Sequence, residues 1–421
     1  MKKLTIAQKL HSIKITPPGF MYHLLGWVWK TFIAKKYNVH INDKIGMSKI
    51  DGSYIFISNH ASRLDYIFTG IPVYPKCMNY VAGYNEFHRL HLSLVFRLLH
   101  VIPKKNFVPD VYSIKEILRV LKAKGRICIF PEGMSSISGA NQPIANGTGK
   151  LLKKAGVPVY YSIIRGGYLT SPKYNLKDRL GKVEVEIDQL FTPDDLAKFS
   201  TEEIEDIINK AIYHDDYAWN KVAKNHYDIG DNGAEDLETL LFWCPKCGKQ
   251  HVMNTEGNKI FCEVCGNGAT LTDTYELVPF DDNCVIPETQ TKWFDMQREV
   301  IKKEISFEGY SFTETVELGM LPDYKYLVGD ATSEIVGKGQ LTLDHSGLTY
   351  DGTKNDKPWS FHIDIKHLPT YGMCTDVSRF YTFVDGEFVE FYPENKVVEK
   401  FFIATEEIHR LMGGKWQNFK F

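Results

Sequence analysis

The chain has 421 residues, of which 43% are hydrophobic and 24% are charged. These fractions are typical of folded globular domains, and they exclude a mostly disordered, collagen-like or polytopic membrane protein. At roughly 150 residues per domain, the length predicts about three domains.

Charge is divided unevenly along the chain. Residues 1–180 hold 27 Lys and Arg against 8 Asp and Glu, a net charge of +19, whereas the remainder holds 23 against 44, a net charge of −21. The basic half favours an anionic partner: a phosphorylated ligand, an acidic carrier protein, nucleic acid or an anionic membrane surface. Composition alone leaves these partners open.

The first fifty residues combine nine Lys and a single Asp with one aromatic-rich apolar segment, residues 19–34. On a helix, this segment places five apolar side chains on one face: Met21, Leu24, Leu25, Val28 and Phe32. The segment is too short for a membrane span. The pattern is typical of a helix lying in a membrane interface, and equally of a core helix with a solvated lysine face.

The N-terminus lacks the apolar core and the cleavage site of a signal peptide. We therefore expect a cytoplasmic protein that is peripheral at the inner face of the membrane, with reduced thiols.

Apolar runs alternate with helical patterns between residues 51 and 189. Strands are expected at residues 54–58, 126–130, 157–164 and, as an edge strand, 183–187. Helices are expected from the Ser113–Glu116 capping box through Leu121, and at residues 149–155 with Gly156 as the stop. This order predicts an α/β fold with a largely parallel sheet flanked by helices, in which ligands lie beyond the carboxyl ends of the strands.

Further helices are expected to open at Thr192 and at Ser200, the second running to Lys224. The polar, Gly- and Asp-rich residues 226–235 predict a linker. A helix at 291–305, short strands from residue 326 onward and a closing helix at 405–412 before Gly413 complete the pattern.

The first candidate for chemistry follows the strand at 54–58. If Ser62 is an N-cap, Asp65 stands at the third helical position and its carboxylate can bend back to His60. A carboxylate on one imidazole nitrogen fixes the tautomer and leaves the other nitrogen to accept a proton, which makes a general base. The alternative is a plain capping box with His60 as a turn residue.

The second candidate follows the strand at 126–130. Gly133, Ser135 and Ser136 offer backbone and hydroxyl donors to an anionic oxygen. Alone, this Pro-Glu-Gly segment is equally compatible with an ordinary turn.

Together the two segments resemble those of the glycerolipid acyltransferase family, which includes the 1-acylglycerol-3-phosphate acyltransferases. Asn59, His60, Ser62 and Asp65 stand as in the family's NHxSxxD block. Phe130-Pro131-Glu132-Gly133 matches the start of its FPEGTRS block, and Val157-Pro158-Val159 resembles its last, apolar block. Co-linear motifs after the expected strands are more specific than any one motif.

The sequence departs from the family at two arginine positions. Met134-Ser135 stands where the family has Thr-Arg, and Lys104 stands where the family usually has Arg. A lysine is a point charge without the bidentate fork of a guanidinium. The candidates for contacts to an acceptor's phosphate are therefore Lys104, Lys105, Arg63 and Ser136.

The resemblance implies transfer of a fatty acyl group from acyl-CoA or acyl carrier protein to the hydroxyl of a lysophospholipid, foremost 1-acylglycerol-3-phosphate, in phospholipid biosynthesis. His60 would remove the hydroxyl proton and Asp65 would orient and charge-balance the imidazole, without a Ser or Cys nucleophile. The remaining motif residues would bind substrate: Asn59, Ser62, Phe130, Pro131, Glu132 and Gly133.

Cys244-x-x-Cys247 and Cys262-x-x-Cys265 are separated by 14 residues, and Gly248 and Gly266 follow the two pairs. This spacing resembles a zinc ribbon, in which four thiolates close a tetrahedral structural Zn²⁺ site. A redox or iron-bearing site is the alternative.

Residues 326–421 weakly resemble a PH-like or GRAM-like β domain with a capping helix. The predicted organisation is an amphipathic interface segment (residues 1–45), an acyltransferase domain (46–225), a zinc ribbon (240–275) and a helix with a β-rich domain (285–421). Lipid or protein recognition and simple packing are both compatible with the last domain.

Two other functions fit parts of the sequence. The missing arginines favour a catalytically silent lipid-binding module, which the presence of both His60 and Asp65 opposes. A nucleic-acid protein would use the cysteine pairs, but these lie in the acidic half, so no nucleic-acid partner is expected.

Overall fold

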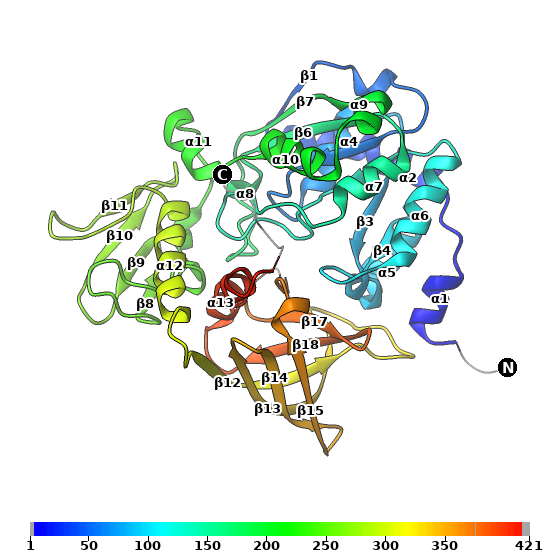
Figure 1. The fold of residues 1–421 in the computed structure, drawn as a ribbon. Coiled ribbons are helices and arrows are strands. Elements are labelled where there is room, and N and C mark those ends of the chain that lie inside the picture. The colour runs from blue at the N-terminus through cyan, green and yellow to red at the C-terminus, as the bar shows by residue number, and fades with distance from the viewer. Residues whose placement is uncertain (1–3, 375, 415–421) are drawn as a thin grey trace.

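The computed structural model describes residues 4–374 and 376–414, and its N-terminal half is built on a seven-stranded sheet (Figure 1). The strand order is β1-β7-β6-β2-β5-β3-β4, and only the β6–β7 pair is antiparallel among the described pairs of this sheet. The strands are β1 (Val39–Asp43), β2 (Ile55–Ser58), β3 (Asn79–Gly83), β4 (Ile102–Lys104), β5 (Ile127–Ile129), β6 (Val159–Arg165) and β7 (Val183–Phe191). The predicted α/β class with a largely parallel sheet is confirmed.

Helices cover both faces of this sheet, because a parallel sheet is apolar on both sides. One apolar cluster holds buried residues of α1 (Ile6–Ser12), α2 (Phe20–Val28) and α4 (Asp65–Val73), with Phe96 of α5 (Leu90–Leu98) packed against it. A second cluster joins the opposite face to α6 (Val111–Lys122), α7 (Thr148–Ala155), α9 (Pro193–Lys198) and α10 (Thr201–Ile212). The short α3 (Ala34–Lys36), α8 (Gly167–Thr170) and α11 (Asp216–Ala223) complete this half.

Three predictions about these elements were wrong. Helix α6 begins at Val111 because the Asp110 side chain accepts from the Tyr112 and Ser113 amides, so Ser113 is not the N-cap. The helix expected to run to Lys224 breaks after α10, since Asp215 caps the separate helix α11. Strand β7 is not an edge strand, because β1, which the sequence pattern did not reveal, pairs with its outer side.

The aromatic segment near the N-terminus is helical throughout, with α2 continued by a π-helical turn (Trp29–Ile33) and α3. Its packed face differs from the predicted one: Tyr22, Gly26 and Trp29 are buried, whereas Leu24 and Phe32 are exposed. Gly26 is required there, since a Cβ at this position would come within 2.5 Å of the Tyr74 ring. Within residues 4–374 and 376–414, no helix has the length and apolar character needed to cross a membrane.

The segment predicted as a linker, residues 226–235, is largely exposed but is anchored to the N-terminal half at Tyr227. Tyr227 is buried and its hydroxyl donates to the Lys182 carbonyl. A four-stranded antiparallel sheet follows: β8 (Met253–Glu256), β9 (Lys259–Cys262), β10 (Gly268–Leu271) and β11 (Leu277–Pro279).

The C-terminal part is a second seven-stranded sheet with one helix packed on it and another helix packed against the first (Figure 1). Its order is β15-β14-β13-β12-β18-β17-β16, all antiparallel. The elements are α12 (Gln290–Ile305), β12 (Ser311–Met320), β13 (Glu334–Asp344), β14 (Gly347–Lys354), β15 (Lys357–Asp364), β16 (Gly372–Met373), β17 (Phe380–Val384), β18 (Glu387–Pro393) and α13 (Val398–Leu411). The likeness to PH or GRAM domains stays a prediction.

The closing helix α13 begins seven residues before the predicted start. Residues 397–403, VVEKFFI, are rich in β-branched and aromatic side chains, which favour strands in isolation. Phe401, Phe402 and Ile403 are all fully buried, so tertiary packing and not local preference makes this stretch helical.

Glu399 on α13 is buried, and neither carboxyl oxygen has a hydrogen-bond partner among the described residues. Burial and Glu406 raise its pKa to about 8, although Arg298 and Lys173 act in the opposite direction. The folded protein therefore holds this proton to a higher pH than the unfolded chain does. Its contribution to stability is present below the ordinary pKa of 4.5 and is lost as the pH rises to about 8.

We expect Glu399→Gln to remove this loss of stability, so that the variant gains roughly 4 kcal/mol in free energy of unfolding over the wild type between pH 5 and pH 8.5. Urea unfolding at both pH values measures the difference. The exposed Glu308→Gln is the matched control, and equal pH slopes for all three proteins would contradict the assignment.

Candidate active site and metal site

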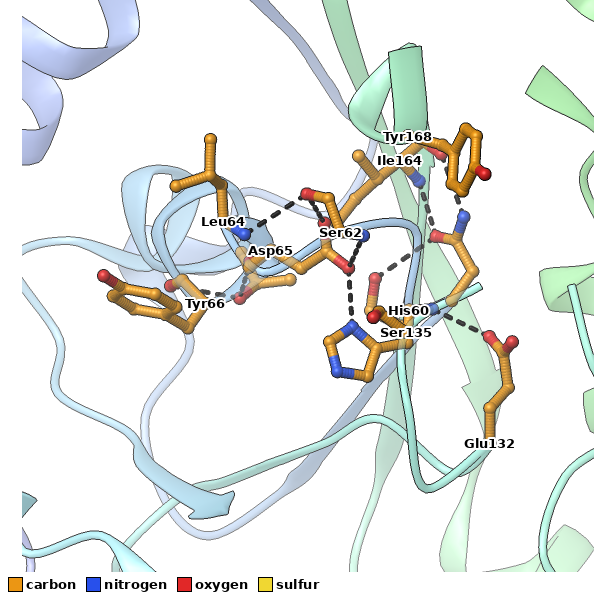
Figure 2. A network of polar contacts seen from close by, with 12 residues as sticks. His60, Ser62, Leu64, Asp65, Tyr66, Glu132, Ser135, Ile164 and Tyr168 are labelled. Carbon is orange, nitrogen blue, oxygen red and sulfur yellow. Dashed lines mark hydrogen bonds and ion pairs between the residues drawn. The ribbon is translucent and has the colours of Figure 1, made fainter. Parts of the chain in front are cut away.

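His60 and Asp65 meet at the junction between β2 and α4, as Figure 2 shows. The His60 Nδ1 lies 2.8 Å from the Asp65 Oδ2. Asp65 is fully buried, and the Ser62 amide and hydroxyl each donate to its carboxylate at 2.9 Å. Burial raises the pKa of Asp65, and the hydrogen bonds from His60 and Ser62 oppose that shift.

The predicted contact between His60 and Asp65 is thus confirmed, but the predicted cap is wrong. Leu64 is the N-cap residue and Asp65 is the first residue of α4, not the third. Ser62 lies one turn earlier and holds the carboxylate from the side. The carboxylate still reaches back, because a short turn between Ser62 and Leu64 brings the helix start beside the end of β2.

The turn after β5 fixes the backbone of His60 on both sides. The His60 amide donates to Glu132 Oε1 at 2.7 Å, and the Ser136 amide donates to the His60 carbonyl at 2.7 Å. The Phe130 ring stacks on the imidazole, with 4.5 Å between the ring centroids. With Nδ1 donating to Asp65, the imidazole Nε2 points away from the carboxylate and makes no hydrogen bond within the described residues.

Glu132 is fully buried and accepts three hydrogen bonds. Its carboxylate accepts from the His60 amide, from Asn141 Nδ2 at 2.6 Å and from the Gln142 amide at 2.9 Å. Burial raises its pKa to about 8, and the three donors pull in the opposite direction. Glu132 therefore holds the two turns together.

Gly133 gives this turn its shape, because its φ of 84° lies in the left-handed region that other residues rarely adopt. A Cβ there would also come within 3.1 Å of the Phe107 ring. The Gly133 carbonyl accepts from Asn106 at 3.0 Å.

Three residues predicted to bind substrate are committed to the protein itself. Asn59 makes two hydrogen bonds to the Ile164 backbone and so joins β2 to β6. Ser136 Oγ donates to the Ala140 carbonyl at 2.6 Å. Arg63 contacts the Leu176 carbonyl and Asp178. Each of these side chains therefore has a hydrogen-bond partner within the protein.

The two lysines after β4 differ from each other. Burial lowers the pKa of Lys104, whose ammonium lies 3.5 Å from Asn106 Oδ1. The Lys105 ammonium donates to the Gly386 carbonyl at 2.6 Å and lies over the Phe383 ring, so it binds the C-terminal sheet. Pro131 is buried and its carbonyl accepts from Ala145.

One charged residue near the second turn was missed at the sequence level. Lys173 is 5% exposed, and its ammonium donates to Ser135 Oγ at 3.3 Å. Among the described residues no carboxylate forms an ion pair with it, and burial lowers its pKa. No motif in the sequence marks Lys173, since it lies in an irregular segment after α8.

The four paired cysteines converge at one point. Their sulfur atoms all lie within 4.8 Å of one another, and the Cys244–Cys265 and Cys247–Cys262 sulfurs are 3.7 and 3.8 Å apart. Tetrahedral Zn²⁺ with bonds of about 2.3 Å requires sulfur separations of about 3.8 Å, so the donor set fits that ion. The predicted glycines adopt left-handed conformations, with φ of 73° at Gly248 and 70° at Gly266. These four cysteines can hold a metal ion.

Comparisons with known proteins bear on the N-terminal half. The family model described as Acyltransferase matches residues 36–164. The crystal structure of PlsC, the 1-acyl-sn-glycerophosphate (LPA) acyltransferase from Thermotoga maritima, is similar at 20% identity and a TM-score of 0.40. That match covers 48% of this chain and 81% of the PlsC chain. No curated protein gave a significant match. The segment that the family model matches includes the His60–Asp65 pair and the Phe130–Gly133 turn.

Proposed function

We propose that the protein transfers a fatty acyl group from the thioester of acyl-CoA or acyl carrier protein to the hydroxyl of a lysophospholipid, foremost 1-acylglycerol-3-phosphate, in phospholipid biosynthesis. The observation that carries this proposal is the 2.8 Å contact between His60 and Asp65 with the imidazole Nε2 left to face a substrate. The match of residues 36–164 to an acyltransferase family supports the reaction type.

The chemistry follows from this geometry. The acceptor hydroxyl gives its proton to His60 Nε2 as its oxygen attacks the thioester carbonyl carbon. The buried Asp65 carboxylate stabilises the imidazolium that forms, and the proton then leaves with the thiolate when the C–S bond breaks. No protein nucleophile is needed, because the hydroxyl attacks directly.

A transfer assay tests the proposal against its rival, a silent lipid-binding module on the same fold. Purified protein receives radiolabelled acyl-CoA or acyl carrier protein with a panel of lysophospholipids. We expect labelled diacyl product with at least one acceptor. Binding of lysophospholipid without product from either donor would favour the silent module.

We further propose that Lys173 and Lys104 supply the positive charge that the two missing arginines supply in the family. The Lys104 ammonium contacts Asn106, whose side chain donates to the Gly133 carbonyl, and the Lys173 ammonium donates to Ser135 Oγ. Both ammoniums therefore lie near the turn after β5. Neither has a carboxylate partner within ion-pair distance in residues 4–374 and 376–414. An anionic phosphate group would fill that role.

We expect Lys173→Met to raise the KM for a phosphorylated acceptor about tenfold, with little change for an uncharged monoacylglycerol. Methionine keeps the volume, so the fold is retained. The matched control is Lys177→Met, since Lys177 is 69% exposed and pairs with Glu235. An equal rise in KM for both acceptors would show that Lys173 only supports the fold.

The remaining assignments are proposals of the same kind. Zn²⁺ bound by Cys244, Cys247, Cys262 and Cys265 would be structural, because four thiolates leave no open position for a substrate. The protein would be cytoplasmic and peripheral at the inner face of the membrane, with the exposed side of α2 in the lipid interface. The domain boundaries predicted from the sequence stay proposals.

A further inference from the structure

A groove of about 460 Å³ lies between α5 and the loop at residues 326–329, which precedes β13. It joins the two halves of the chain, since Leu327 exchanges backbone hydrogen bonds with His88 and Leu90. Its lining is mainly apolar, with Leu90, Leu94 and Val328 as the largest aliphatic contributors.

The apolar surface continues beyond the groove along α5. Leu90, Leu94 and Leu98 recur every four residues and are 52%, 63% and 42% exposed, and Val328 is 68% exposed. A row of leucines at this spacing normally packs against another element. Here it faces outward, at a cost in solvation that a docked partner would remove.

The helices near this surface carry positive charge only. No acidic side chain occurs on α1, α2 or α5, whereas Lys9, Lys14 and Arg97 do lie on or beside α1 and α5. The C-terminal loop carries charges of both signs, with Asp323, Lys325 and Asp330 all exposed. An anionic lipid surface complements such a combination of leucines and basic side chains.

The surface also belongs to the same layer as the N-terminal helix. Buried residues of α1, α2 and α4 share one apolar cluster with strands of the main sheet, and Phe96 of α5 packs against that cluster. α1 and α5 lie at the β4 end of that layer (Figure 1). Phe20, Leu24 and Trp27 of α2 are exposed on the same layer.

From this we infer that the groove between α5 and residues 326–329 docks on an anionic lipid bilayer, with its apolar side chains inserted among the acyl chains. The inference rests on the proposed function, whose substrates are lipids, and extends it, because the C-terminal half then shares the membrane contact. Two contacts hold the orientation of the protein on the bilayer, which one amphipathic helix alone does not.

Vesicle flotation without any acyl donor tests the inference. Vesicles contain either phosphatidylcholine alone or phosphatidylcholine and phosphatidylglycerol in equal amounts. We expect tighter binding to the anionic vesicles, and at least a tenfold weaker partition for Leu94→Glu and for Val328→Glu. The matched control is Val222→Glu, an 85% exposed valine on α11, which is expected to bind like the wild type.

Three results would overturn the inference. Leu94→Glu and Val328→Glu could bind vesicles like the wild type while Leu24→Glu does not, which would confine the contact to α2. Sedimentation could reveal a dimer that Leu94→Glu dissociates, which would assign the groove to a second copy. The two variants could instead bind vesicles normally and lose binding to acyl carrier protein, which would assign the groove to that protein and not to the bilayer. The two proposals can also fail separately. If the wild type transfers no acyl group but both variants still lose vesicle binding, the docking surface is supported and the proposed function is refuted.

Discussion

Replacing His60 with alanine is expected to lower kcat for acyl transfer by about 10³-fold, the usual contribution of a positioned general base. The free nitrogen of the imidazole can take the acceptor proton. The backbone amide and carbonyl of His60 are both hydrogen-bonded to the turn that carries Glu132 and Ser136. Asp65→Asn is expected to lower kcat strongly, but less than His60→Ala does, since an amide neither stabilises the imidazolium nor imposes the tautomer.

The chain offers a matched control for this experiment. His226 also pairs with a carboxylate, Asp273, at 2.7 Å, but its side chain is 73% exposed. His226→Ala should keep full activity, whereas His60→Ala should lose it while retaining the circular dichroism spectrum and the melting temperature of the wild type. Full transfer by folded His60→Ala would remove the imidazole from the mechanism.

Removing the Zn²⁺ that we propose the four cysteines bind is expected to lower the free energy of unfolding by about 5 kcal/mol or more, because binding of Zn²⁺ to four thiolates is a large part of the stability of small cysteine-rich sheets. Cys244 and Cys262 belong to the apolar cluster that also contains the C-terminal sheet and α13. Loss of the site should therefore destabilise more than the four-stranded sheet itself.

Metal analysis and chemical unfolding check this prediction together. Natively purified protein should contain one zinc per chain, and Cys262→Ser should contain none and unfold at lower denaturant concentration. Cys284→Ser is the control, since Cys284 is not one of the four converging cysteines. A wild-type protein without zinc, or a Cys262→Ser variant of unchanged stability, would refute the structural role.

The parts of the fold that follow local rules could be predicted from the sequence. Capping boxes at Thr192 and Ser200 open helices where the spacing indicates, and the apolar runs of β2, β5 and β6 lie together in the sheet. Helix α13 and strand β1 were missed or misplaced, because their state is set by long-range packing and pairing that the local pattern does not encode.

The candidate site divides in the same way. The contact between His60 and Asp65 was predicted through an N-cap at Ser62, and the contact is present although Leu64 and not Ser62 is the cap. The hub at Glu132 depends on Asn141 and Gln142, and the ammonium at Ser135 comes from Lys173, which is 38 residues away. Such partners are brought in by tertiary structure, so no spacing rule finds them.

The turn that carries Glu132 has a further consequence for the chain as a whole. Met134, which replaces the family's threonine, is 7% exposed and packs in the same apolar cluster as the C-terminal sheet, as does Ile137. A fragment ending near residue 225 would expose both of these side chains to solvent. The segment that matches the acyltransferase model is accordingly not a detachable module, because side chains of the turn after β5 are buried in the apolar core of the C-terminal half.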